Sequence, residues 1–225
     1  PFNMDTPPVW RAIRDTKRVL SKIDGRAEDS GNEVAIVVDW RERLRRSTAE
    51  ANVFSLVYKE SLIGLYASGV PFDLMTLDDF LAQPANRYRK AVFLNVIAPE
   101  EDVQIALQQR VSAPDFKSVW LVHCPYLLPS SLAKVLDTSA LPKGSEVWRQ
   151  LLLDIGAKPL GPAGHYIRRH GNIVMFHTGK AGTFKLTLPE SMSKVRELYS
   201  GRKYKSSELT LQTDGPDTFL FMAKD

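Results

Sequence analysis

The sequence predicts an α/β fold, an open parallel sheet with helices on both faces, followed by a small all-β antiparallel sandwich module. Two observations carry this prediction. Short apolar runs rich in β-branched residues alternate with amphipathic segments over residues 31–160, which is the pattern of strands and crossover helices. From Gly161-Pro162 onward, short runs are separated by turn residues, as in antiparallel sheets. The 225 residues are enough to bury a core without disulfide bonds.

The first predicted element is an amphipathic helix at residues 9–24, VWRAIRDTKRVLSKID. Its apolar side chains recur at three- and four-residue spacing, and Pro7 and Pro8 stand at its start, where proline is tolerated. Residues 25–32 form a polar linker. We therefore expect a helix and linker at 1–30, an α/β domain at 31–160 and a β-sandwich domain at 161–225.

The α/β part is predicted to alternate strands and helices. Strands are expected where apolar runs lie between turn signals, and helices where apolar residues recur at helical spacing. In chain order, the predicted elements are a strand at 33–39, a helix at 48–68 ended by Gly69, a strand at 72–76, a short helix from Asp78, a strand at 90–97, a helix at 99–111, a strand at 116–123 and a helix at 145–155 ended by Gly156. In such sheets, ligands bind at the carboxyl ends of the strands.

The carboxyl-terminal part is predicted to contain strands only. The runs HYIRR, NIVMFHTG, TFKLTLPE, KVRELYSG, ELTLQT and TFLFMAKD are short, and several alternate polar and apolar residues. The turn sequences Arg169-His170-Gly171-Asn172 and Gly179-Lys180-Ala181-Gly182 predict hairpin connections.

Composition excludes several classes of protein. The net charge of +4 is mild and no basic face is evident, so we expect no nucleic-acid partner. No run approaches about 18 apolar residues, so we expect no membrane span. The single Cys124 excludes an intramolecular disulfide framework and a cysteine-only metal site. The chain begins with Pro1 instead of Met, which suggests either a piece of a longer chain or a processed product; the compartment is left open because a targeting signal could lie upstream.

Cys124 lies where open α/β sheets place nucleophiles, at the end of the strand FKSVWLVH. The turn His123-Cys124-Pro125-Tyr126 has no flanking glycine, and Pro125 has no N–H to serve an oxyanion hole. We therefore favour a structural role for this thiol over a catalytic one.

Asp39 and Trp40 follow the first buried strand at the same edge. An indole stacks on sugar faces and a carboxylate binds sugar hydroxyls, so the pair is a candidate carbohydrate contact; a capping aspartate beside a packed tryptophan is the favoured alternative. The basic run at 41–46 favours a solvated loop or partner surface over a phosphate site. The candidate contacts to carbohydrate or to another domain are Asp39, Trp40, His123, Cys124 and Tyr126.

We expect no metal and no cofactor. A metal site needs three or four converging ligands, and no second ligand pair stands at a recognisable spacing from His123. No glycine-rich phosphate loop follows the first strand.

The order of segments resembles a known arrangement. EVAIVVDW, GVPFDLMTLDDFL, KAVFLNVIAPEED and SVWLVHCPYL resemble the non-catalytic middle domain of family 42 glycoside hydrolases, the β-galactosidases. That domain is flavodoxin-like, similar to class I glutamine amidotransferases, and follows a catalytic barrel. The tail from KLTLPE to TFLFMAKD resembles the β-sandwich that closes many glycosidases. The His123-Cys124-Pro125 turn departs from the small residues usual in the family.

The resemblance implies that the chain is a non-catalytic accessory and oligomerisation region of a large glycoside hydrolase. A catalytic barrel would lie upstream of Pro1 in the same polypeptide, the assembly would be a homo-oligomer, a trimer by resemblance, and the sheet edge would contribute rim contacts to carbohydrate. No family catalytic residue maps onto this chain. The alternatives are a stand-alone carbohydrate-binding protein with Trp40 as its platform, and a degenerate amidotransferase-like hydrolase that uses Cys124.

Overall fold

The computed structural model describes residues 14–19, 21, 23, 30–39, 41, 59–97, 99–116, 118–122, 124, 127–129, 131–136 and 143–223. In these residues a parallel sheet with flanking helices is followed by antiparallel sheets, which confirms the predicted fold class.

The parallel sheet has five strands among the described residues, in the order β2-β1-β3-β4-β5. Its strands are β1 (Val34–Val38), β2 (Asp73–Thr76), β3 (Lys90–Leu94), β4 (Ser118–Val122) and β5 (Lys134–Leu136). The first four lie within the predicted runs, although β3 ends at Leu94, because Asn95 turns the chain with a φ of 55°. The prediction missed β5, whose three residues are too few for a pattern to stand out.

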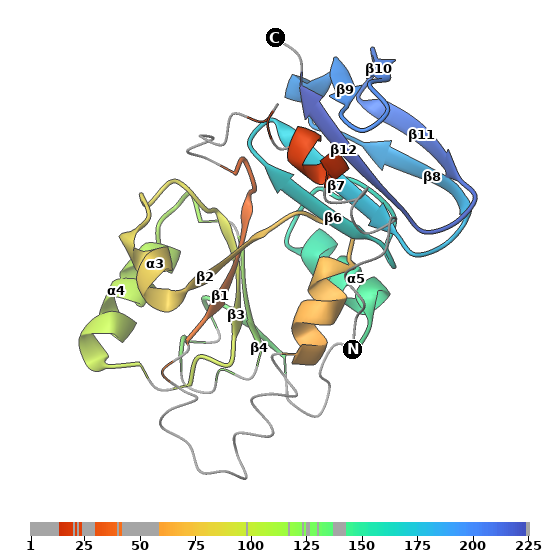
Figure 1. Cartoon of the computed structure of the whole chain (residues 1–225). Helices are drawn as coiled ribbons and strands as arrows, with labels where there is room; N and C mark the ends of the chain where they lie inside the picture. Colours follow the sequence, from red (N-terminus) through yellow and green to blue (C-terminus); the bar gives the residue numbers. More distant parts are fainter. Residues whose placement is uncertain are drawn as a thin grey trace.

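Helices cover both faces of this sheet (Figure 1). Along β1, Ala35 and Val37 pack with α3 (Leu77–Ala82) and α4 (Glu101–Val111), whereas Val34 and Ile36 pack with α5 (Ser145–Asp154) and the helical residues 59–66. Every residue of β1 is buried, as expected of a strand covered on both faces.

Two predicted helices are only partly covered by the described residues. Residues 14–19 are helical, but residues 21 and 23 are not, so the first helix ends before its predicted end at residue 24. Residues 59–66 are helical within the predicted helix at 48–68, and the earlier part of that helix lies outside the described residues.

The antiparallel part contains a five-stranded sheet in the order β10-β9-β12-β7-β6 and the pair β11-β8. The strands are β6 (Tyr166–His170), β7 (Ile173–Thr178), β8 (Gly182–Thr187), β9 (Val195–Glu197), β10 (Lys203–Tyr204), β11 (Glu208–Thr213) and β12 (Asp217–Ala223). Phe176, Leu186 and Phe221 belong to one core that joins the two sheets into a sandwich. A 3-10 turn, η3 (Glu190–Met192), interrupts the strands, where no helix was predicted.

The two predicted hairpins have different outcomes. Gly171 and Asn172 connect β6 and β7, whose residues His170 and Ile173 pair directly, so the first hairpin is confirmed. The second prediction was wrong: β7 pairs with β6 and β12, and β8 pairs with β11, so the segment from Gly179 crosses between the two sheets.

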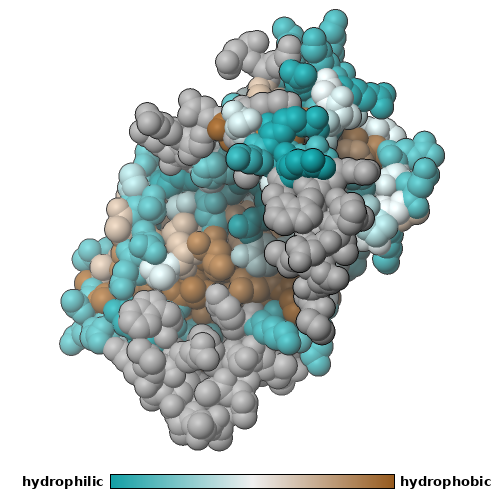
Figure 2. All heavy atoms as spheres, viewed as in Figure 1, coloured by the Kyte–Doolittle hydropathy of each residue, from teal (hydrophilic) through white to brown (hydrophobic). Residues whose placement is uncertain are grey.

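Figure 2 shows hydrophobic residues gathered over the middle of this view, above the parallel sheet, with hydrophilic residues around them. Among the described residues, no helix is both long enough and apolar enough to cross a membrane.

Candidate functional site

Three polar side chains lie at the carboxyl edge of the parallel sheet, each just after a strand. Asp39 follows β1, Asn95 follows β3 and Cys124 follows β4, and these three strands are neighbours in the sheet. All three residues are at most 2% exposed. The backbone N–H of Asn95 donates to the Val122 carbonyl at 2.9 Å, which fixes the turn after β3 against the end of β4.

Arg41 holds the carboxylate of Asp39. Asp39 Oδ1 accepts from the backbone N–H of Arg41 at 3.1 Å and from its Nε at 3.0 Å, and Oδ2 accepts from Nη2 at 3.3 Å. The same guanidinium lies 3.3 Å from Asp78 and 3.9 Å from Glu100. The hydrogen bonds to Asp39 and the charges of the three acids raise the pKa of Arg41. Both oxygens of Asp39 are thus engaged by a neighbouring side chain, and Arg41 is the centre of a charge cluster instead of part of a solvated run.

The Cys124 thiol is enclosed by backbone groups. Its Sγ accepts from the N–H of Val96 at 3.2 Å and lies 3.3 Å from the carbonyl oxygens of Phe93 and Val122. Cys124 is 2% exposed. A nucleophilic thiolate needs access to substrate and a neighbouring base or cation, and this thiol instead binds the ends of two strands together.

Trp40, His123 and Tyr126 lie outside the described residues, so their part in a carbohydrate contact stays a prediction. In the described part of the chain, no group of three or more histidine, cysteine, aspartate or glutamate side chains could hold a metal ion.

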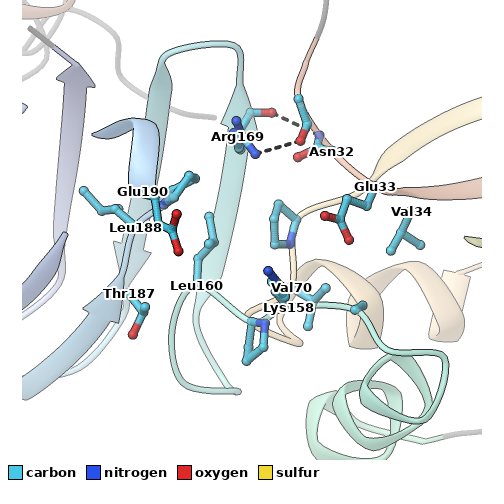
Figure 3. Close-up of a pocket in the computed structure, with 15 residues that line it drawn as sticks. Asn32, Glu33, Val34, Val70, Lys158, Leu160, Arg169, Thr187, Leu188 and Glu190 are labelled. Atoms are coloured by element: carbon cyan, nitrogen blue, oxygen red, sulfur yellow. Dashed lines mark hydrogen bonds between the residues drawn. The ribbon is translucent and has the colours of Figure 1, made fainter. Parts of the chain in front are cut away.

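A groove of about 440 Å³ lies at the opposite end of the parallel strands, between the α/β part and the β sandwich (Figure 3). Asn32 and Arg169 stand at one end, Lys158 and Leu160 stand at the other, and Glu33 faces Glu190 across it. The walls thus carry two acidic and two basic side chains.

Two of these four charged side chains bind other groups of the chain. Glu33 accepts from Lys90 at 2.6 Å, and this hydrogen bond, with the charges of Lys90, Lys158 and Arg169, lowers the pKa of Glu33. Arg169 donates to the Gly31 carbonyl at 2.7 Å and to the Gly171 carbonyl at 3.3 Å. Sequence reasoning missed this groove because its residues are far apart in the chain and carry no shared spacing. At one end of the groove, Arg169 joins the two parts through its hydrogen bond to Gly31 and through its carbonyl, which accepts from Asn32.

No protein-family model matches the sequence, and no curated protein matches it significantly. The fold is similar to that of solved β-galactosidases. Gan42B, a GH42 β-galactosidase from G. stearothermophilus, matches with a TM-score of 0.64 and 13% identity over 99% of this chain and 45% of that chain. The β-galactosidase from Bacillus circulans sp. alkalophilus matches with a TM-score of 0.64 and 12% identity over 96% of this chain and 45% of that chain.

The similarity at this level of identity concerns the fold. It covers the α/β part and the β sandwich together, so the resemblance in fold that the sequence motifs predicted is confirmed over nearly the whole chain. The chain spans about 45% of the length of these enzymes.

Proposed function

We propose that this chain is a non-catalytic accessory region of a glycoside hydrolase similar to the GH42 β-galactosidases, which supports a catalytic barrel of the same polypeptide and assembles the enzyme into an oligomer. The observation that carries the proposal is the structural match, which covers 96–99% of this chain and only 45% of each enzyme. Because this chain has the fold of nearly half of a known enzyme, we expect it to have the role of that half.

The sheet edge supports a structural role. Asp39 is bound by Arg41, and the Cys124 thiol contacts backbone groups, so neither is available as a general base or a nucleophile. The acids near Arg41 neutralise a cation instead of flanking a reacting bond.

An exposed apolar pair supports assembly. Ile63 is 49% exposed and Val147 is 46% exposed. Their helices lie in close contact: Gly64 faces the Trp148 side chain so closely that a Cβ on Gly64 would lie only 2.3 Å from it. We infer that these two exposed apolar side chains contribute to a contact between copies of the chain.

Two measurements test the proposal. The purified chain is expected to leave nitrophenyl galactoside unchanged, while the reading frame upstream of the Pro1 codon is expected to encode a barrel with repeated strand–helix units. Turnover by the purified chain that is lost when one of its own carboxylates is replaced would overturn the accessory role.

The assembly is tested by the mass of the chain in solution. We expect an oligomer in multi-angle light scattering, and a shift to monomers with Ile63→Arg. The matched control is Ile105→Arg, an isoleucine with the same 49% exposure on α4, across the sheet. A monomeric parent chain, or equal effects of both substitutions, contradicts assembly through this helix pair.

A further inference from the structure

A groove of aromatic and polar side chains crosses the outer face of the β sandwich. Two adjoining cavities, of about 380 and 520 Å³, share Tyr66, Arg168 and Met175. The first also contains Tyr166 and His177, and the second extends to the ring of Phe72. We name the surface made by Tyr66, Tyr166, Arg168, Met175, His177 and Thr218 the tyrosine face.

The strand register places these side chains in rows. Tyr166 pairs with His177 and Arg168 pairs with Met175 across β6 and β7, and His177 pairs with Thr218 of β12. Along β6, Tyr166 and Arg168 are exposed, whereas Ile167 between them is buried in the sandwich core. Five of the six residues of the tyrosine face therefore lie on paired strands, which hold their side chains at fixed positions, and Tyr66 comes from the helical residues 59–66.

The ring of Tyr166 on this face is accessible. Tyr166 is 43% exposed, one of the few large apolar side chains of the described residues that reach this value. Its ring lies 6.1 Å from that of His177. Tyr66 instead packs against Phe72 at 5.1 Å and supports Arg168, whose guanidinium lies over its ring.

The polar groups on this face have few partners within the chain. The guanidinium of Arg168 lies 4.6 Å from the centre of the Tyr66 ring and 5.8 Å from that of Phe72, and no described residue forms a hydrogen bond or an ion pair with it. His177 Nδ1 is bonded to Thr218 Oγ1 at 2.8 Å, which fixes the imidazole and leaves Nε2 available. The hydroxyls of Tyr66 and Tyr166 have no partner among the described residues. Hydrogen-bond donors and acceptors therefore surround the aromatic rings.

We propose that the tyrosine face is a carbohydrate-binding site, on which the exposed ring of Tyr166 stacks on the C–H face of a sugar unit while Arg168 and His177 bind hydroxyls. Two adjoining cavities suit an oligosaccharide better than a single sugar. The charge favours a neutral ligand over a nucleic acid: the two cavities are lined by the cations Arg168 and Arg169 and by the anion Asp73, and nucleic-acid binding needs several cations.

This site is separate from the sheet-edge candidates Asp39 and Cys124, and it does not depend on the accessory role proposed above. Oligosaccharide binding can be present or absent whether or not an upstream barrel exists. Failure of one proposal is thereby distinguishable from failure of the other.

The test is titration of the full chain with galactotetraose, cellotetraose and maltotetraose by calorimetry, with an oligothymidylate of similar length as the polyanion. We expect saturable binding of at least one saccharide and none of the oligonucleotide. Tyr166→Ala is expected to weaken saccharide binding about tenfold or more, as truncation of a central aromatic residue does. Arg168→Gln is expected to weaken it as well.

The chain offers matched controls for both substitutions. Tyr199→Ala removes a tyrosine that is 37% exposed outside the tyrosine face, and Arg202→Gln removes an arginine that lies over the ring of Tyr204 at 5.1 Å. Both controls are expected to bind as the parent chain does. No binding of any of the three saccharides, equal losses in the control variants, or binding of the oligonucleotide alone overturns the proposal. Unchanged thermal unfolding of Tyr166→Ala excludes misfolding as the cause of a loss.

Discussion

His165 lies between two phenylalanine rings in the sandwich. Its ring centre is 5.7 Å from that of Phe176 and 4.6 Å from that of Phe184. Burial, with a smaller effect of the nearby Lys180 charge, lowers the pKa of His165. The unfolded chain therefore binds a proton here more readily than the folded chain does, so this residue makes the free energy of unfolding rise with pH up to about 6.5, the ordinary pKa of histidine.

We predict that His165→Phe loses less stability than the parent chain when the pH falls from neutral to about 5, because phenylalanine cannot bind a proton at this position. Urea unfolding at a series of pH values measures the effect. His170→Gln, which changes an exposed histidine on β6, is the control and should retain the slope of the parent chain. Parallel pH curves for His165→Phe and the parent would contradict the prediction.

Asp73 at the start of β2 gathers donors from two segments. Its carboxylate accepts from Asn32 Nδ2 and Tyr88 Oη, both at 2.8 Å, from Arg87 Nη2 at 3.3 Å and from the hydroxyl of Ser30. Charged hydrogen bonds of this kind are stronger than neutral ones. The residues before β1, the start of β2 and the loop before β3 are held together here.

Asp73→Asn is expected to lower the free energy of unfolding by about 2–3 kcal/mol. The amide carries no negative charge, and its NH₂ group would face the hydrogen-bond donors that the Asp73 carboxylate accepts from. Chemical denaturation provides the measurement. Asp154→Asn serves as the control: Asp154 accepts one exposed hydrogen bond from Gln150, so its loss should cost no more than about 0.5 kcal/mol. Similar losses in the two variants would show that the hydrogen bonds to Asp73 contribute no more to the free energy of unfolding than one exposed hydrogen bond does.

At the level of elements, the segment after helical residues 59–66 pairs with the connection between the two parts of the chain. The Gly69 carbonyl accepts from the N–H groups of Leu160 and Gly161, and the Ala67 carbonyl accepts from Gly164. Gly69 has a φ of +77°, and a Cβ there would lie 2.3 Å from the Gly161 carbonyl oxygen. Only glycine fits this approach.

Gly69→Ala should therefore destabilise the chain by about 1–3 kcal/mol through backbone strain and a clash. The midpoint of thermal unfolding reports this change. A Cβ on Gly179 would meet no atom within 4 Å, so Gly179→Ala is expected to change stability little. Equal midpoints for the two variants would mean that the segment at Gly69 moves aside without cost.

The elements that sequence predicted best are those whose evidence is local. β1 and β3 are buried runs of β-branched and aromatic residues, and such runs have few alternatives to a central strand. β10 has two residues, too few for a pattern. The Gly179–Gly182 turn has hairpin chemistry, yet β8 finds its partner in β11. Strand pairing depends on distant residues that a local turn sequence does not contain.

The same reasoning applies to sites. That Asp39 and Cys124 would share one edge followed from their places after parallel strands. Arg41 as the partner of Asp39, Asp78 and Glu100 did not follow, because Asp78 lies in α3 and Glu100 precedes α4, both far from Arg41 in the sequence. The tyrosine face was missed for a related reason: Tyr66 comes from a helix of the α/β part and Arg168 from β6 of the sandwich.

For the whole molecule, Arg149 is a direct connection between the α/β part and the segment that leads into the sandwich. Its Nη1 donates to the Ser68 carbonyl at 3.0 Å and to the Gly161 carbonyl at 2.5 Å. The Leu160 carbonyl in turn accepts from Thr187 of β8. The change of sequence pattern predicts a boundary near residue 160, and hydrogen bonds from both the α/β part and the sandwich hold the chain at this point.

Arg149→Ala is expected to uncouple the two parts, because two carbonyls lose a charged donor worth about 1.5–3 kcal/mol. Scanning calorimetry should give one peak for the parent chain and a broadened or divided peak for the variant. Gln150→Ala, the next residue of α5, is the control and should keep one peak. A single sharp peak at the parent temperature for Arg149→Ala would place the coupling elsewhere.

The position of β12 has a consequence for synthesis on the ribosome. β12 follows all the other strands in the chain, yet it lies between β9 and β7 in the middle of its sheet. The strands and helices of the α/β part have all emerged by Asp154, so that part can close while translation continues. The β7 edge of the nascent β6–β7 hairpin must instead stay unpaired until β12 leaves the exit tunnel. A ribosome that stalls before β12 would therefore hold a finished α/β part beside an open sheet edge, the state in which nascent chains are most exposed to mispairing and to chaperones.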